Sequence, residues 1–504
     1  MTRAAAPPAM ALRSRINRLG DLSERQRTWG TLALCFLLVL LMRAPYWSVA
    51  LGRDEGGLSW VAKHWDGLSL YGDYWVDRPP LLLAMFKVAM LGGDHGLRIL
   101  GAVAAIALII AITLLARALA GPRAGRIAAV FAALLAGSAT LGAVYTPGEL
   151  LASVPSTLSV LCLVLAHRSR RTRYVIAAGA LAVTAVLIKQ SFLDAGAAGA
   201  AFILASAVSD REVRFRWPLM YAAGAVLPLI VTLLWLAVAG VSLSFFVYTM
   251  FGFRLDLLHT LASSNIPLQT RVRHLRVPAW DSGLVLVLVG SLAGLVHLRR
   301  DRVLAVTFAV WLAAAAFGVL GGGSYFMHYL IELIAVGCVG AAAVLANVPM
   351  PIRIVAVGVV AALAVNAAND AATLLDRGKP HRREIAIGHY IRDHARAGDT
   401  QYVLYARANV VYYAGIPQPY PYLWSLMVRV RPGARARLER LFASPERPTW
   451  LVKWQKPRLW GLDPDGSLGR LLKRNYRRAA VVCGRKIYLR RDYATPPPFT
   501  RRGC

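Results

Sequence analysis

The chain has 504 residues and a formal net charge of +32; 57% of its residues are hydrophobic and 17% are charged. Soluble globular proteins are about 45–50% apolar and about 25% charged. The excess apolar residues form blocks of about 18–24 residues, each long enough to cross a hydrocarbon core of about 30 Å. This pattern argues against a soluble enzyme, a secreted disulfide scaffold and a disordered chain. It predicts a polytopic α-helical membrane protein.

The positive charge does not indicate nucleic-acid binding. Arg greatly outnumbers Lys, and much of this charge lies in short loops between apolar blocks, where basic residues set the orientation of a membrane protein. The five cysteines form no CxxC motif and no Cys/His metal spacing. We therefore expect membrane lipids, and no nucleic acid, among the partners.

The apolar blocks predict about eleven membrane spans. Arginines fill the arm at 1–29 and alternate short loops after it, whereas the short loops at 145–148 and 321–324 lack Lys and Arg. The positive-inside rule then places the N-terminal arm in the cytoplasm, and an odd number of spans places the C-terminal tail outside. The expected spans are 30–51, 97–116, 126–144, 149–166, 174–189, 192–209, 218–240, 281–298, 303–320, 327–347 and 352–370.

These spans define an expected transmembrane domain at 30–370 in the cell membrane, with long external loops at 52–96 and 241–280. The tail at 371–504 is polar and alternates short strand-like and helical runs, which is typical of a small external α/β domain. We expect strands at Thr400–Ala406, Thr449–Gln455 and Arg485–Arg490, and a helix at Pro432–Ala443.

The first long external loop contains two apolar stretches with helical spacing. One follows Glu55, and the other follows Pro79 and is too short to span a membrane. Both are expected to lie in the membrane interface. Asp54 and Glu55 would serve equally well as the acidic cap of the first helix, and Arg78 before two prolines would fit a turn whose side chain reaches head groups.

Ionisable residues gather near the predicted external ends of the spans. An ion-coupled transporter should instead carry such residues near the membrane midplane, and no carboxylate lies in the inner half of any expected span. The pattern therefore favours chemistry or binding at the external surface. The residues concerned are Asp54, Glu55, Glu149, Lys189, Asp194, His328 and Glu332.

Three motifs together resemble the GT-C membrane glycosyltransferases, most closely the protein O-mannosyltransferase and aminoarabinose-transferase group. They are Asp54-Glu55 after the first span, Tyr71-x-Asp73-x(4) followed by Arg78-Pro79-Pro80, and Gly322-Gly323 leading to His328-Tyr329. The resemblance covers about residues 30–347 and implies a GT-C fold. It also implies transfer of a monosaccharide from a polyprenyl-phosphate donor to a glycan, lipid or protein hydroxyl of the cell envelope.

The resemblance also implies roles for individual residues. Asp54 matches the catalytic base and Glu55 its acidic neighbour, and pairing of the two carboxylates would raise the pKa of one. The implied donor-phosphate contacts are Arg78, Arg271, Arg273 and Tyr325. Ser324 stands where relatives carry an arginine, so Arg254 or Arg276 are alternatives. The implied substrate contacts are Asp77, Asp73, Glu149, Lys189, His328, Tyr329 and Glu332.

This chemistry requires a carboxylate at the acceptor hydroxyl and cations at the departing phosphate. No cofactor is required, although Asp77, His328 and Glu332 offer ligand types that suit a divalent cation. A transporter or flippase of lipid-linked sugars is the alternative function. The many aromatic residues of the tail would form either the core of the external domain and its seam with the membrane part, or a surface that roofs the outer cavity and helps to hold a glycan acceptor.

Overall fold

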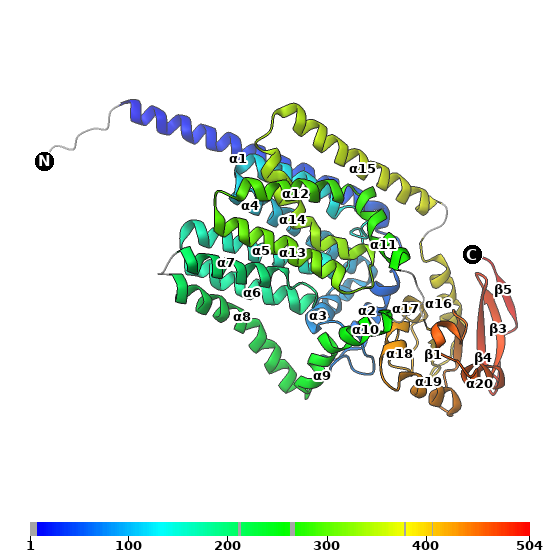
Figure 1. The fold of residues 1–504 in the computed structure, drawn as a ribbon. Coiled ribbons are helices and arrows are strands. Elements are labelled where there is room, and N and C mark those ends of the chain that lie inside the picture. The colour runs from blue at the N-terminus through cyan, green and yellow to red at the C-terminus, as the bar shows by residue number, and fades with distance from the viewer. Residues whose placement is uncertain (1–7, 210–212, 263–267, 377–379, 406) are drawn as a thin grey trace.

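The computed structural model describes residues 8–209, 213–262, 268–376, 380–405 and 407–504. A bundle of long helices carries a small region with a β-sheet at one end, as Figure 1 shows. The chain is therefore a mostly helical, multi-pass membrane protein. The long helices are α1 (Pro8–Arg43), α4 (Gly93–Ala136), α5 (Gly148–Ser169), α6 (Thr172–Ile188), α7 (Asp194–Ser209), α8 (Val213–Val238), α12 (Leu284–Leu298), α13 (Arg302–Gly321), α14 (Glu332–Leu345) and α15 (Met350–Asp376).

Within the described residues, 6 helices are long and apolar enough to cross a membrane, or 7 when a bent pair is taken as one span. The bent pair is α11 (Leu268–Asp281) with α12, and three shorter apolar helices lie at 172–188, 194–208 and 350–365. This count by length and composition is lower than the eleven spans that the apolar blocks predicted. Most of the predicted spans nevertheless coincide with a helix of the bundle.

The chain reverses direction within helix α4, at the point where the sequence predicted a loop between two spans. Ala120 and Gly121 have non-helical backbone angles, and Gly121 has a φ of 87°, a conformation that only glycine adopts readily. A Cβ built on Gly125 would lie 3.0 Å from the Arg117 Cβ and from the Thr113 carbonyl oxygen. The chain therefore doubles back here, between the spans expected at 97–116 and 126–144, and the second segment ends at Ala136.

Short helices fill the two long loops, as the sequence predicted for the first of them. The first loop contains α2 (Arg53–His64) and α3 (Pro80–Ala89), and Pro80 occupies the first turn of α3, where a missing backbone N–H costs nothing. The second loop contains α9 (Leu243–Val247), α10 (Phe253–Ala262) and α11. A 3-10 turn, η4 (Met327–Ile331), leads into α14.

The C-terminal region is built on a mixed five-stranded sheet in the order β1-β2-β4-β3-β5. The three strands that the sequence predicted are present as β1 (Gln401–Val403), β2 (Trp450–Lys453) and β4 (Arg485–Arg490), whereas β3 (Tyr476–Val482) and β5 (Thr500–Arg502) were missed. The helices are α16 (Arg382–His394), α17 (Ala408–Ala414), α18 (Ser425–Val430), α19 (Ala434–Ala443) and α20 (Ser467–Asn475).

Strands β3 and β4 form a hairpin whose turn is tied to the end of the chain. The turn residues Cys483 and Gly484 have φ values of 47° and 74°, as two-residue hairpins of the primed type require. Cys483 forms a disulfide with Cys504, and β5 pairs in parallel with β3. The spacing of these two cysteines in the sequence does not predict their pairing.

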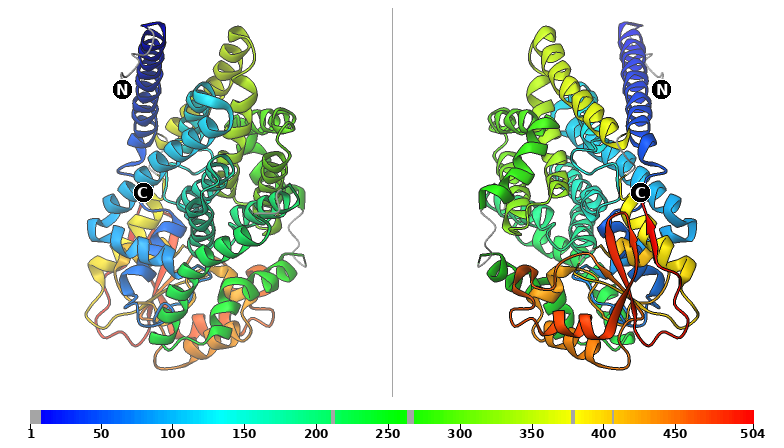
Figure 2. Two further views of the ribbon diagram at one scale, coloured as in Figure 1. Left: turned by 90° about the vertical axis from the view of Figure 1, so that its left-hand side faces the viewer. Right: turned by 90° about the vertical axis from the view of Figure 1, so that its right-hand side faces the viewer.

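The C-terminal region packs directly against the first long loop, as both views in Figure 2 show. A Cβ on Gly56 would lie 2.7 Å from the Asn409 Cβ, and one on Gly57 would lie 2.4 Å from the Trp424 ring. These two glycines therefore let α2 approach the C-terminal region closely. The amide of Asn409 also donates to the Leu51 carbonyl at 3.2 Å.

Candidate functional site

Asp54 lies in the first turn of α2 and joins the membrane part to the C-terminal region. Its Oδ1 accepts hydrogen bonds from the Arg53 Nε at 3.2 Å and from the Trp424 Nε1 at 2.9 Å. The side chain is 41% exposed, so a substrate can reach it. Burial by itself raises the pKa of Asp54, but the nearby charges of Arg53, His328 and Arg78 outweigh this effect and hold the pKa well below its usual value.

Glu55 points away from Asp54 into a buried ion pair. Its Oε1 lies 2.6 Å from Arg98 and accepts the Thr146 backbone N–H at 2.8 Å, while its Oε2 accepts the Gly52 N–H at 3.2 Å. The expected pairing of the two carboxylates is therefore wrong, because the Glu55 carboxylate is taken up by Arg98, Thr146 and Gly52, although both residues line one cavity. The pKa of Asp54 is lowered rather than raised, because the charges of Arg53, His328 and Arg78 act on it.

Asp77 holds two arginines side by side. Its Oδ1 lies 2.8 Å from Arg78, and its Oδ2 lies 2.6 Å from Arg254. Asp77 itself is 2% exposed, and Gln190 donates to its carbonyl oxygen at 2.7 Å. Charge-assisted bonds of this kind are strong and directional, so Asp77 positions two guanidinium groups for an anion. Burial lowers the pKa of Arg78, but the charges of Asp77, Tyr329 and Asp54 raise it above its usual value.

A second charged group contains residues from three spans. The Lys189 Nζ lies 2.7 Å from the Glu149 Oε1, and the His328 Nε2 lies 3.8 Å from the same oxygen. The Lys189 ammonium also lies over the Tyr329 ring, 5.4 Å from its centroid. Glu149 and Lys189 are almost fully buried, so the pair is desolvated and each partner needs the other.

Asp54 and Arg78 lie in the wall between two cavities. The first, which we call the His328 cavity, has a volume of about 320 Å³ and is also lined by Glu149, Lys189 and Arg407. The second, which we call the Trp424 cavity, has a volume of about 360 Å³ and is also lined by Asp77, Arg254, Arg271, Tyr329, Trp424 and Trp460. Arg53, Asp54, Leu58 and Arg78 line both.

Several residues that the resemblance implied lie outside these cavities. Asp73 and Arg273 are exposed, Tyr325 packs against the hydrophobic core, and Glu332 is buried beside Gly318; none of the four lines either cavity. Asp77, His328 and Glu332 do not form a metal-ligand cluster. Among the described residues, Glu439, Asp463 and Asp465 are the group of three whose ligand atoms lie within 4.8 Å of one another.

Sequence reasoning missed Arg53, Trp424, Trp460 and Arg429 as residues of the site. Trp424 is 370 positions away from Asp54 in the chain, and no motif connects the two. Most other aromatic residues of the tail are buried in its own core, including Tyr420, Trp450 and Trp454. These positions agree with the expectation that the aromatics form the core of the region and its seam with the membrane part, and a role in holding a glycan acceptor stays a prediction. Of these four residues, only Arg53 could have been found from the sequence, because it lies directly before Asp54, the proposed base.

Comparisons with known proteins agree with the fold. Residues 77–236 match the family model described as dolichyl-phosphate-mannose-protein mannosyltransferase. The crystal structure of ArnT from Cupriavidus metallidurans bound to undecaprenyl phosphate is similar at 15% sequence identity, with a TM-score of 0.59, and the match covers 93% of this chain and 98% of that one. No curated protein matches the chain.

The archaeal oligosaccharyltransferase of Archaeoglobus fulgidus has a similar fold. Its apo form matches at 14% identity with a TM-score of 0.60, covering 93% of this chain and 75% of that one. The same archaeal protein, AglB, in complex with an inhibitory peptide and a dolichol-phosphate, matches at 13% identity with a TM-score of 0.58, covering 94% of this chain and 75% of that one. The predicted resemblance to the GT-C membrane glycosyltransferases is confirmed.

Proposed function

We propose that this protein transfers a monosaccharide from a polyprenyl-phosphate donor to a cell-envelope acceptor at the external leaflet. The observation that carries the proposal is the placement of Asp54 and Arg78 in one wall shared by two cavities, with Asp77 holding Arg78 beside Arg254. A carboxylate next to a pair of cations fits a reaction that removes a proton from a hydroxyl and releases a phosphate.

In this proposal the donor phosphate lies against Arg78 and Arg254 in the Trp424 cavity. Arg271 lines the same cavity and replaces the arginine that relatives carry at the position of Ser324. Apolar side chains such as Val76 and Leu261 line this cavity too, as a lipid-linked ligand requires. The His328 cavity, with Glu149, Lys189 and His328, offers the donors and acceptors that a sugar ring needs.

The acceptor oxygen attacks the anomeric carbon, and the bond between that carbon and the phosphate oxygen breaks. Asp54 takes the acceptor proton, while Arg78 and Arg254 stabilise the charge on the departing polyprenyl phosphate. Asp77 positions these arginines and touches no substrate. Glu55 lines the His328 cavity, but its carboxylate is occupied by Arg98, Thr146 and Gly52, so we assign it no role in the reaction.

The proposed orientation has eleven spans, a cytoplasmic N-terminus and an external C-terminal region. Dividing the Pro80–Ala136 segment at Gly121, and adding the bent pair and the three shorter apolar helices, recovers these spans. The disulfide Cys483–Cys504 also supports an external location, because disulfides persist in oxidising compartments. Asp54, Arg78 and the sheet region then lie on the same outer side.

The test uses the purified protein in nanodiscs with undecaprenyl-phosphate donors that carry mannose, glucose or arabinose. For the donor that is turned over, Asp54→Asn should reduce sugar transfer at least about a hundredfold while donor affinity stays nearly unchanged. Asp73→Asn, an exposed aspartate of the same loop, is the control and should retain full activity.

Near-normal transfer by a folded Asp54→Asn protein would contradict the assignment of the base. The experiment also separates this function from the alternative, a flippase of lipid-linked sugars. A flippase would move the donor across the bilayer with its sugar attached, so undecaprenyl phosphate would not be released in any of the reactions.

A further inference from the structure

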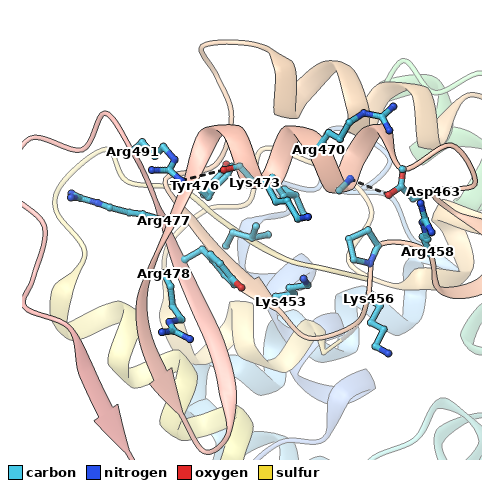
Figure 3. A pocket seen from close by; sticks show the side chains of 16 residues that line it. Lys453, Lys456, Arg458, Asp463, Arg470, Lys473, Tyr476, Arg477, Arg478 and Arg491 are labelled. Carbon is cyan, nitrogen blue, oxygen red and sulfur yellow. Dashed lines mark hydrogen bonds between the residues drawn. The ribbon is translucent and has the colours of Figure 1, made fainter.

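The C-terminal region contains a large cleft that is separate from the site above. Its volume is about 900 Å³, and it lies between β2, α20, β3, β4 and the loop at 456–463 (Figure 3). It shares no lining residue with the His328 or Trp424 cavity. Its lining is strongly basic and includes Lys453, Lys456, Arg458, Arg470, Lys473, Arg477, Arg478 and Arg491.

In the part of the chain that the structure describes, these eight cations lack acidic partners. Among the described residues, none of them forms an ion pair with a carboxylate, whereas Arg435 and Arg447 elsewhere in the region pair with Asp465 and Asp492 at 2.8 and 2.9 Å. Asp463 is the single acidic residue of the lining, and its carboxylate accepts the Leu468 and Gly469 backbone N–H groups at 2.9 and 3.0 Å. It is therefore engaged at the start of α20.

Uncompensated cations on facing elements repel one another. Burial lowers the pKa of Lys453, and the charges of Lys486, Lys473 and Lys456 lower it further, which is the expected effect of nearby like charges. Lys453 comes from β2, Lys473 from α20 and Arg478 from β3, and Figure 3 shows them around one hollow. An anion that spans these elements would relieve the repulsion and gain several charge-assisted bonds at once.

The remaining lining favours a glycan over a membrane surface. Leu451, Pro457, Leu472 and the half-buried Tyr488 provide apolar faces inside the cleft, and aromatic rings of this kind present an apolar body with a polar tip. In the described part of the C-terminal region, the exposed large hydrophobic residues are Trp460 and Phe499. Neither lines this cleft, so it offers no apolar anchor of the type that inserts into a lipid surface.

The segment at 456–463 connects the cleft with the Trp424 cavity. Lys456, Pro457 and Arg458 line the cleft, while Trp460, two positions further on, lines the Trp424 cavity. The Tyr405 hydroxyl donates to the Pro457 carbonyl at 3.0 Å, and the Arg429 guanidinium lies over the Trp460 ring at 5.4 Å. The segment is therefore held from both sides, and a ligand that passes over it reaches from the cleft toward Asp54.

We propose that this basic cleft binds the carboxylate- or phosphate-bearing part of a glycan acceptor and that the 456–463 segment leads the reacting end to the Trp424 cavity. The acceptor role rests on the proposed function, whereas the binding of an acidic glycan by the cleft does not. The natural acceptor is accordingly an acidic glycan rather than a neutral one.

The first test measures binding of hexagalacturonate to the full-length protein in nanodiscs, with maltohexaose as the neutral probe. The double variant Lys473→Glu/Arg478→Glu should bind hexagalacturonate at least about tenfold more weakly. The control Arg437→Glu/Arg440→Glu makes the same change of charge on the exposed surface of α19 and should bind like the unmodified protein. Asp54→Asn should also bind normally, since it changes only the proposed base.

Equal binding by the unmodified protein and the cleft variant would overturn the proposal, as would equal affinity for maltohexaose and hexagalacturonate. Two further probes distinguish the source of the anion. Inorganic phosphate that binds as tightly as the glycan, or phosphatidylglycerol vesicles that bind through the cleft while hexagalacturonate does not, would also overturn it. In transfer assays, the cleft variant should raise the KM for an acidic acceptor and leave the affinity for the donor unchanged.

Discussion

Asp54 is a weak base, because its neighbours stabilise the charged form of its side chain. The Arg53 guanidinium, the Trp424 indole and the nearby Arg78 all favour its charged form, so it attracts a proton less strongly than a free aspartate does. In the proposed reaction, much of the driving force must then come from departure of the phosphate. This gives the two arginines held by Asp77 a large share of the catalytic effect.

Because the pKa of Asp54 is lowered, we predict that kcat/KM stays constant on the acid side of the pH profile. A free aspartate titrates near pH 3.9, and Asp54 titrates below that value, so its carboxylate stays charged as the pH falls. We expect kcat/KM for sugar transfer to show no loss due to Asp54 between about pH 7 and about pH 5. A pH series on the unmodified protein, with donor binding measured at each pH, checks this. An acid limb centred near pH 6 that disappears in Asp54→Glu would contradict it.

Arg78 provides a test of the donor phosphate. Arg78→Ala should weaken undecaprenyl-phosphate binding about tenfold or more, because a charge-assisted, two-pronged contact is lost. Arg78→Lys should restore part of the affinity, since lysine keeps the charge without the fork. Binding can be measured by lipid displacement in detergent. Arg273→Ala, at an exposed position on α11, is the matched control, and equal weakening by both variants would place the phosphate elsewhere.

At the scale of elements, local signals predicted what is locally determined. The apolar spacing after Glu55, the proline at the start of α3, the short apolar run of β2 and the alternating pattern of β4 each lie within a few residues, and each element is present. Strand β3 was missed because its sequence YRRAAVV lacks a regular alternation of apolar and polar residues. The link of Asp77 to Arg254 could not be predicted, because no rule of spacing connects two loops so far apart.

Helix α2 shows how a motif residue can serve the scaffold. Glu55 lies one position after the proposed base, but its carboxylate binds Arg98, which is 2% exposed. Replacing one partner leaves the other charge buried without compensation. We therefore expect Glu55→Gln to lower the free energy of unfolding by about 3 kcal/mol or more, visible as a lower thermal midpoint in detergent. Asp73→Asn, at an exposed position of the same loop, is the control and should unfold near the normal temperature.

This prediction separates a supporting role for Glu55 from a catalytic one. If Glu55 supports α2, folded Glu55→Gln protein should keep a substantial part of its sugar transfer at low temperature. A Glu55→Gln protein with normal stability and a hundredfold lower rate would instead return this residue to the reaction itself.

At the scale of the whole molecule, the site depends on contact between the membrane part and the C-terminal region. Trp424 donates to Asp54, Asn409 donates to Leu51, and the Tyr412 hydroxyl donates to Asp94 at 2.6 Å. The sequence predicted a separate external domain, yet these contacts make the region one wall of the site. Such long-range contacts arise from the packing of elements, and a single sequence carries no pattern for them.

The same contacts allow a strict test of orientation, because the first long loop and the C-terminal region must lie on one side of the membrane. Asp73→Cys and Glu446→Cys place a thiol at exposed positions of these two parts, and Ser169→Cys places one in the basic loop after α5. The positive-inside rule puts this basic loop in the cytoplasm.

In intact cells, a membrane-impermeant maleimide should label the first two variants and leave Ser169→Cys unlabelled until the cells are opened. The unmodified protein is the background control: Cys35 and Cys338 are buried and Cys483 is paired with Cys504, whereas Cys162 is only partly buried, so labelling is compared with this background. Labelling of Ser169→Cys alone would invert the orientation and move the proposed reaction to the cytoplasmic leaflet. Labelling of only one of the two external variants would contradict the contact between Asp54 and Trp424 on which the site depends.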